Sequence, residues 1–590
     1  MNQIGGSGWT IDVEGAYAYL GEGLRLTVID ISQPDRPDVI GSLLMTNDII
    51  DLKAVGNTVY VTNPEGLHII NVANPGAPIQ VGTYKTANIV YSVDVAGPYA
   101  YIGEFGGLRV IDVSNPALPI KVGEVPIAGW PLEIVVTHEV AYVVDGTNGL
   151  HIIDITNEAD PFEVGFQQVD NATDVFVTNG YAYVVGVYGY LHVYDIDDLT
   201  KPLLVGSLEL GSGSDSIVVD GNDAFVVGSP YLTVVNVANP NSLGIRSVLN
   251  IPGSMGRDVV IMGQKAFVAS YDGGMRIVDI TIPIFPTEIG SYITPGLVRK
   301  MVVSDGYAYT MKGYSGGLFT INITDPTHIS LVGTPVPVRG VYELSLRDNF
   351  IWAASDEGLL ALDITNREQP VMASVYDTGA VAYAVHVMDG IAYVGTFRGL
   401  SIVDVSNPYA PVGLGFLELP GEYFYYDIDA KDGFVFMTWN KWADGYTYGM
   451  HMIDARNPRS PAKVGILEPT GSDSEMEIVG DYLYYTGSNG LRITNIASPM
   501  TPVEVGFFPL GSCRLASLAK DRNHVHVGTA VGCGYEDNVI YSVNINNPSA
   551  PVLTASYPLT YTAILDVASS GEYLYAAGYF SGLLVIYKEE

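Results

Sequence analysis

A short motif that recurs along the whole chain constrains the fold more than any other feature. In the segment Gly107–Gly123, alternating apolar residues end in a Ser-Asn-Pro turn, and a second short run ends in Val-Gly. Such alternation is the period of a half-buried β-strand, and Asn followed by Pro is typical of a turn. The pattern returns from one end of the 590-residue chain to the other. A repeat of this kind predicts an array of similar β units.

The polar residue that closes the motif allows the copies to be counted. It is Asp30, Asn71, Asp112, Asp154, Asp195, Asn236, Asp279, Asn322, Asp363, Asp404, Asp454, Asn495 and Asn544. Tyr587 holds the same place in a last, truncated copy, which brings the number of copies to fourteen. Most neighbouring copies are 41 to 43 residues apart, and two longer spacings come from insertions at Thr438–Gly449 and Gly528–Asn538.

Each copy contains four strand candidates. In the third copy these are Ser92–Val95, Tyr99–Ile102, Leu108–Val113 and Ile120–Val125, and a tight turn at Gly97 joins the first two. Four short strands in about 40–45 residues are typical of a propeller blade. The sequence therefore predicts an all-β fold, a β-propeller of fourteen four-stranded blades.

Four strings of the motif point to a known family. They are LTVIDIS (26–32), LRVIDVS (108–114), LHIIDIT (150–156) and LSIVDVS (400–406). These strings resemble the LVIVD repeat, which is found in bacterial and archaeal cell-surface proteins. The resemblance spans the chain and implies a propeller in a surface or extracellular setting. It implies no activity, because the family carries no known catalytic residues.

The number of rings follows from the blade count. Rings of four to eight blades are usual, so we expect two tandem seven-bladed rings, 1–281 and 282–590, with one large fourteen-bladed ring as the alternative. The last blade lacks its own fourth strand. In a single ring, Gln3–Gly5 would supply that strand. In two rings, Gln3–Gly5 would instead close blade seven, and Pro286–Tyr292 would cross over to blade fourteen.

Charge and hydropathy exclude several classes of partner. The chain has 28 Lys and Arg against 64 Asp and Glu, a formal net charge of −36. Such a surface repels phosphate backbones and anionic membranes, so a nucleic-acid partner is excluded. No apolar run approaches the roughly 18 residues of a membrane span, so direct membrane insertion is not expected. No signal peptide is visible at Met1–Gly6, and the expected location, extracellular or cell-surface, rests on the resemblance.

Blade eleven contains the densest group of aromatic residues. They lie in two loops that should meet on the face where the insertions emerge, the candidate binding face. The ligand-binding candidates are Tyr423, Tyr425, Trp439, Trp442, Tyr446 and Tyr448. Aromatic platforms edged by polar groups suit sugar rings or a protein partner. The alternative is that these side chains pack the long loop onto the blade.

A carboxylate recurs at one position of the innermost strands. It is Asp51, Glu133, Asp174, Asp258, Glu343, Asp427 or Glu475. Clustered carboxylates suit hard cations such as calcium, which makes these residues candidate metal ligands. The alternative is that each carboxylate caps backbone N–H groups of its own or the next blade. The recurrence from blade to blade favours capping.

The two cysteines, Cys513 and Cys533, both fall on the candidate binding face of blade thirteen. An intrablade disulfide between them would suit an extracellular protein, and a free pair is the alternative.

No nucleophile elbow, phosphate-binding loop or zinc-protease motif occurs in the sequence. We therefore expect a non-catalytic surface or extracellular protein that presents its loops to a protein or glycan partner. It would need no cofactor, except possible calcium. The alternatives are a calcium-stabilised structural module and a propeller hydrolase such as a glycosidase. The sequence leaves the oligomeric state open.

Overall fold

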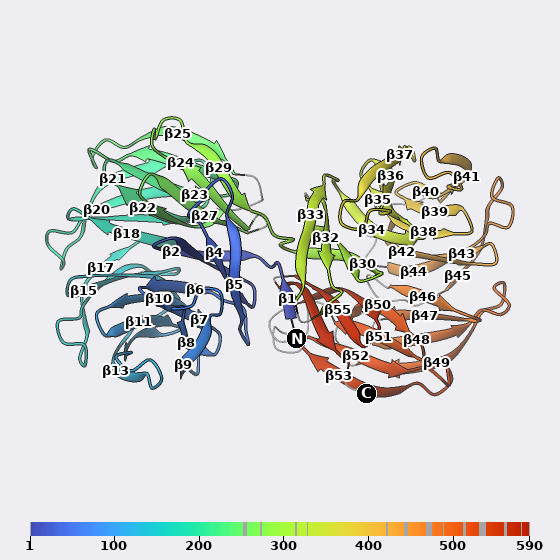
Figure 1. The fold of residues 1–590 in the computed structure, drawn as a ribbon, viewed down its shortest axis with the longest axis horizontal. Coiled ribbons are helices and arrows are strands. Elements are labelled where there is room, and N and C mark those ends of the chain that lie inside the picture. Colours follow the sequence, from blue (N-terminus) through green and yellow to red (C-terminus); the bar gives the residue numbers. More distant parts are fainter. Residues whose placement is uncertain are drawn as a thin grey trace. The chain divides into compact units, whose positions relative to one another are not determined.

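The computed structural model describes residues 2–251, 256–271, 274–312, 316–326, 328–419, 423–441, 447–467, 475–487, 489–510, 515–529, 538–559, 563–579 and 581–588. These residues form fourteen four-stranded antiparallel sheets, which we call blades one to fourteen in chain order (Figure 1). The predicted all-β, propeller-like architecture of fourteen blades is confirmed. The described residues include no helix long and apolar enough to cross a membrane.

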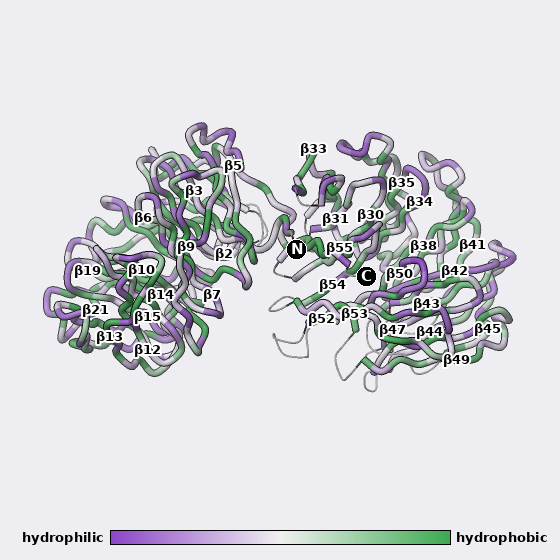
Figure 2. The backbone as a smooth tube through the Cα atoms, turned by 60° about the horizontal axis from the view of Figure 1, so that its bottom comes forward, coloured by the Kyte–Doolittle hydropathy of each residue, from purple (hydrophilic) through white to green (hydrophobic). Residues whose placement is uncertain are grey.

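Blade three shows how the repeat builds each sheet. Its strands β10 (Val90–Ala96), β11 (Tyr99–Glu104), β12 (Gly107–Asp112) and β13 (Ile120–Pro126) pair in chain order. Alternation on β12 places Val110 in a core shared with blade four, and Ile111 in a core shared with blade two. Both faces are therefore buried between neighbouring blades. Hydrophobic strand positions and hydrophilic turns alternate in the same way along the chain (Figure 2).

The Val-Gly ending of the motif is explained by contact with the next blade. Gly82 lies on β9 (Ile79–Lys85), and a Cβ at this position would overlap the carbonyl oxygen of Pro116 in the Asn-Pro turn of blade three. Gly290 on β29 (Thr287–Tyr292) meets the carbonyl oxygen of Pro34 in the same way. The glycine of one blade thus leaves the space that the turn of the neighbouring blade occupies.

The chain divides into two compact units. The N-terminal unit is Gly5–Gly296, and the C-terminal unit is Leu297–Glu590 together with Met1–Ile4. The division after Gly296 differs from the expected boundary after residue 281.

Neighbouring first strands contact one another in succession within each unit. In the N-terminal unit they are β2 (Gly8–Glu14), β6 (Asp51–Val55), β10, β14 (Pro131–Thr137), β18 (Ala172–Thr178), β22 (Ser214–Asp220) and β26 (Gly256–Met262). In the C-terminal unit they are β30 (Val298–Ser304), β34 (Val341–Arg347), β38 (Ala382–Met388), β42 (Tyr423–Lys431), β46 (Met476–Val479), β50 (Leu515–Asp521) and β54 (Ile564–Ser570). In addition, β26 contacts β2, and β54 contacts β30.

The two chain segments that could complete a blade are assigned by their pairing. β1 (Asn2–Ile4) pairs with β56 (Gly582–Tyr587) in blade fourteen, whereas β29 pairs with β28 (Gly274–Asp279) in blade seven. The crossover expected for two rings, with Pro286–Tyr292 in blade fourteen, is therefore wrong. The reason is that β29 keeps the turn and register that join third and fourth strands in the other copies.

Candidate functional site

One repeat position near the start of the first strands holds all seven members of the predicted acidic column. We call the seven residues at this position in each unit its carboxylate tier. In the N-terminal unit the tier is Thr10, Asp51, Ser92, Glu133, Asp174, Ser216 and Asp258. Its four acidic side chains all line a cavity of about 420 Å³. The structure thus brings together the four N-terminal members of the predicted acidic column.

The tier carboxylates Asp51 and Asp258 each bind backbone amides of two blades. Asp51 accepts a hydrogen bond from its neighbour Leu52 N at 2.7 Å, and another from Val93 N of blade three at 2.8 Å. Asp258 of blade seven accepts one from Ile11 N of blade one at 2.8 Å. These contacts are those of the capping alternative. Each such carboxylate fastens the first strand of one blade to that of the next.

Burial and mutual repulsion keep these acids hard to ionise. Burial, followed by the charge of Asp258, raises the pKa of Asp51 to about 7. Burial likewise raises the pKa of Asp174 to about 7. For Glu133, burial and then the charges of Asp51 and Asp174 raise the pKa well above its ordinary value. Burial in this tier therefore favours the protonated, uncharged forms of these acids.

The C-terminal unit has an equivalent tier that includes a lysine. It consists of Lys300, Glu343, Ala384, Asp427, Glu475, Ser517 and Asp566. Four members are acidic, as in the N-terminal unit, but Lys300 stands where Thr10 stands there. Lys300 and Asp566 are not part of the acidic column that sequence reasoning identified.

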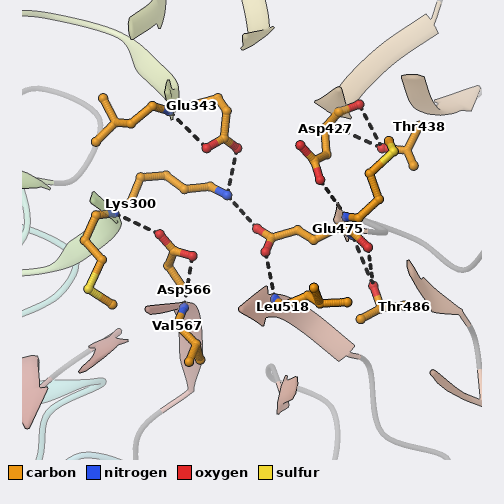
Figure 3. Close-up of polar contacts among 12 residues, drawn as sticks. Lys300, Glu343, Asp427, Thr438, Glu475, Thr486, Leu518, Asp566 and Val567 are labelled. Carbon is orange, nitrogen blue, oxygen red and sulfur yellow. Dashed lines mark hydrogen bonds and ion pairs between the residues drawn. The ribbon is translucent and has the colours of Figure 1, made fainter. Parts of the chain in front are cut away.

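Lys300 of blade eight contacts an acid of the next blade and an acid of a blade far along the chain. Its Nζ lies 2.8 Å from Glu343 Oε2 of blade nine and 2.5 Å from Glu475 Oε1 of blade twelve (Figure 3). Burial alone would lower the pKa of Lys300, but Glu343 and Glu475 raise it above its ordinary value. Burial raises the pKa of Asp566 to about 8, although Lys300 opposes this rise.

The backbone contacts of this tier follow the same rule as in the N-terminal unit. Asp427 accepts a hydrogen bond from Met476 N at 2.6 Å, Glu475 from Leu518 N at 3.0 Å, and Asp566 from Met301 N at 2.8 Å. Glu343 accepts one from its own neighbour Leu344 N at 2.9 Å. The first three of these bonds join one blade to the next.

Sequence reasoning also missed a second set of carboxylates two residues further along the same strands. Asp12 accepts a hydrogen bond from Ala54 N at 2.9 Å, and Asp94 accepts one from Val136 N at 2.7 Å. The sequence signal that could have revealed them is an acid two positions after the tier position, because alternate residues of a strand lie on the same face.

Of the six blade-eleven aromatic candidates, two are buried, one is half-buried, and the side chains of the other three lie outside the described residues. Tyr425 and Trp439 are only 2% and 7% exposed, and both pack in a core that includes Tyr393 of blade ten. The Trp439 ring stacks on His451, with ring centroids 5.3 Å apart. The interpretation of Tyr425 and Trp439 as surface contacts is therefore wrong, because their rings fill the space between two blades.

The other aromatic candidates stay predictions. Tyr448 is half-buried. The backbone of Tyr423 belongs to β42, but its side chain lies outside the described residues, as do Trp442 and Tyr446.

Cys513 and Cys533 also lie outside the described residues, so the disulfide stays a prediction. Within the described ranges, no group of three or more His, Cys, Asp or Glu side chains is arranged to hold a metal ion. The calcium interpretation of the tier is thus left to experiment.

The fold and the repeat define a β-propeller-like repeat protein. The model of the LVIVD repeat matches ten segments of the chain: 5–44, 48–86, 89–126, 130–167, 170–209, 211–249, 253–294, 295–335, 339–378 and 380–415. The chain belongs to the LVIVD-repeat family, which confirms the resemblance seen in the motif.

Two solved structures are similar to this chain at low sequence identity. One is PorZ, described as an essential bacterial surface component of the type-IX secretion system of Porphyromonas gingivalis. PorZ is 12% identical to this chain, and the two structures superpose with a TM-score of 0.63 over 99% of this chain and 86% of PorZ. At this identity, the likeness shows the fold alone. The computationally designed Ika8 protein is 11% identical with a TM-score of 0.40, covering 53% of this chain and 95% of its own. Comparison with curated proteins gives no significant match.

Proposed function

We propose that this protein is a non-catalytic binding or scaffold protein of the cell surface or extracellular space, built from two seven-bladed propellers. The contacts of β26 with β2 and of β54 with β30 support one closed ring in each unit. Membership of the LVIVD-repeat family supports a surface setting, and so does the likeness to PorZ, itself described as a surface component. The partner would be a protein or a glycan.

The observation that carries the proposal is that the buried carboxylates are hydrogen-bonded to backbone N–H groups. Asp51, Asp427 and Asp566 each accept backbone N–H groups of their own blade and of the next. A glycosidase needs two carboxyl groups free to act on the bond between them. Here these groups hold the framework together, and the framework carries the outward loops.

The proposal is tested with the full chain, on intact cells and in solution. A membrane-impermeant amine-reactive biotin should label the protein on intact cells that express it, for example at Lys121, which carries an exposed amine on β13. Labelling that appears only after lysis would contradict the surface location. In solution, neutral oligosaccharides should not be consumed. Release of new reducing ends, lost in Asp427→Asn, would contradict the non-catalytic role.

A further inference from the structure

An open cleft of about 610 Å³ lies on blade five beside the last strand of blade four. One wall comes from the end of β17 (Phe162–Gln168) and the residues that follow it. The other wall comes from β20 (Tyr190–Asp195) and β21 (Leu203–Glu209) of blade five. The volume is that of a typical small-ligand site.

Blade five has an aromatic residue at a cleft position where most copies of the repeat have glycine. Tyr190, His192 and Tyr194 occupy alternate positions of β20 and therefore share one face of the sheet. At the position of Tyr190, ten other copies have glycine: Gly66, Gly107, Gly149, Gly274, Gly317, Gly358, Gly399, Gly449, Gly490 and Gly582. The repeat itself therefore does not require an aromatic residue there.

The aromatic stripe runs from the core out to solvent. Tyr194 is 3% exposed and packs in the core shared with blade four. Tyr190 is 40% exposed, and its ring is nearly parallel to that of His192, with 5.8 Å between centroids and 10° between planes. Tyr188, on the preceding turn, is 66% exposed. Two tyrosine rings are thus available to a ligand while the third anchors the strand.

The turn that carries Tyr188 is held in place before any ligand binds. Gly189 N donates to Gly186 O at 2.9 Å, and Val187 N donates to Asn171 O at 3.1 Å. Gly189 has a φ of +74°, and a Cβ there would overlap the carbonyl oxygen of Ser212. A turn fixed in this way loses little conformational entropy on binding.

The polar groups of the cleft suit a ligand rich in hydroxyls. Gln167, Gln168, Asp170 and Ser207 line it, and Gln168 Nε2 lies 3.4 Å from Asp170 Oδ1. Amides and hydroxyls can both donate to and accept from sugar hydroxyls. Among the residues that line this described cleft, none is Lys or Arg. An anionic ligand would therefore meet one carboxylate and no cation.

We propose that the blade-five cleft binds a neutral oligosaccharide, with sugar rings on Tyr188 and Tyr190 and sugar hydroxyls hydrogen-bonded to Gln167 and Gln168. Flat aromatic faces bury the apolar face of a sugar ring at little entropic cost. This inference rests on the proposed function, because it names the glycan that a surface binding protein would hold.

The experiment measures binding of cellohexaose, maltohexaose and mannohexaose to the full chain by isothermal titration calorimetry. We expect one of them to bind, and we expect Tyr188→Ala and Tyr190→Ala each to weaken that binding at least tenfold. Tyr231→Ala is the matched control, since Tyr231 holds the place of Tyr190 in blade six and is also 40% exposed. It should leave binding unchanged. Unaltered thermal unfolding would show that each variant is folded.

Each other outcome overturns the proposal. No binding of any hexasaccharide, or binding that the two tyrosine variants do not weaken, would remove this site. Tighter binding of oligogalacturonate or choline would assign the cleft to an anionic or a cationic ligand. None of these results contradicts a surface scaffold with a protein partner. Labelling of the protein only after cell lysis would contradict that broader function while leaving the cleft result in place.

Discussion

The two carboxylate tiers have the same number of acids but differ in what balances them. In the N-terminal unit, Thr10 Oγ1 lies 3.1 Å from Asp51 Oδ1 and 3.2 Å from Asp258 Oδ2, so these contacts of Thr10 join blade one to its two neighbouring blades. In the C-terminal unit, the ammonium of Lys300 reaches Glu475, which is 175 residues away in sequence.

The difference shows how one side chain can change the electrostatics of a repeated framework. The backbone bonds of the acids are alike in both units, so they belong to the repeat. A lysine at a tier position occurs in the C-terminal unit only, where it lowers the cost of ionising the acids around it. In the N-terminal unit, Lys53 lines the cavity beside the tier and lies 3.6 Å from Asp94. Ionisation of the tier acids as the pH rises should therefore destabilise the first strands of the N-terminal unit more than those of the C-terminal unit.

The largest expected effect comes from removing the internal cation. Lys300→Met leaves Glu343 and Glu475 without their shared partner, and should lower the free energy of unfolding at pH 8 by about 3–5 kcal/mol. Denaturant unfolding measures the change. Lys121→Met, which removes an exposed pairing with Glu124, is the control and should cost less than about 1 kcal/mol. Equal losses in the two variants would mean that the Lys300 bridge is not stabilising.

Substitutions in the shared framework should cost the same in both units. A Cβ at Gly290 would overlap Pro34 O, and one at Gly506 would overlap Pro548 O. Gly290→Ala and Gly506→Ala should therefore each destabilise by about 1–3 kcal/mol. Gly244→Ala, where a Cβ meets nothing, should be nearly neutral in the same melts. A clear difference between the two damaging variants would show that the frameworks are not alike.

A lysine in the N-terminal tier should make that unit resemble the other. Thr10→Lys places an ammonium between Asp51 and Asp258, and we expect a gain of about 1 kcal/mol at pH 8 because it lowers the pKa of both acids. The gain should disappear at pH 5. Thr10→Val, which removes the hydroxyl without adding charge, separates the effect of the cation from that of the hydrogen bond. Destabilisation of Thr10→Lys at pH 8 would contradict this expectation.

Calcium should have the smallest effect. The oxygens of Asp51 and Asp258 already accept backbone amides, so we expect millimolar calcium to change the free energy of unfolding by less than about 0.5 kcal/mol relative to EDTA. Thermal unfolding with matched magnesium controls measures this. A selective rise of several degrees with calcium would instead support the calcium-stabilised module.

The repeat made most of the fold predictable, but not the ends of the array. Alternation, Asn-Pro turns and Val-Gly endings gave the four strands and fourteen blades. Gln3–Gly5 and Pro286–Tyr292 both match the pattern of a fourth strand, and only pairing distinguishes β1 from β29.

The site was predictable where it follows the repeat. The acidic column was found because its members share a repeat position. Lys300 was not, because it is not an acid and its partner Glu475 lies 175 residues along the chain. Tyr425 and Trp439 were misread because a sequence does not distinguish an aromatic ring packed between blades from one on the surface. The blade-five cleft needs residues from two neighbouring blades, which repeat counting does not bring together.

The most direct test is hydrogen exchange of the unmodified chain, measured by mass spectrometry from pH 5 to pH 8 and corrected for intrinsic rates. A carboxyl whose pKa is raised to about 7 by folding stabilises the protein at low pH, and this stabilisation is lost as the pH rises through about 7. We predict that β6, β18 and β26 lose more protection than β34 and β46 over this range. Equal losses, or a larger loss in β34 and β46, would contradict the claim that Lys300 distinguishes the two tiers.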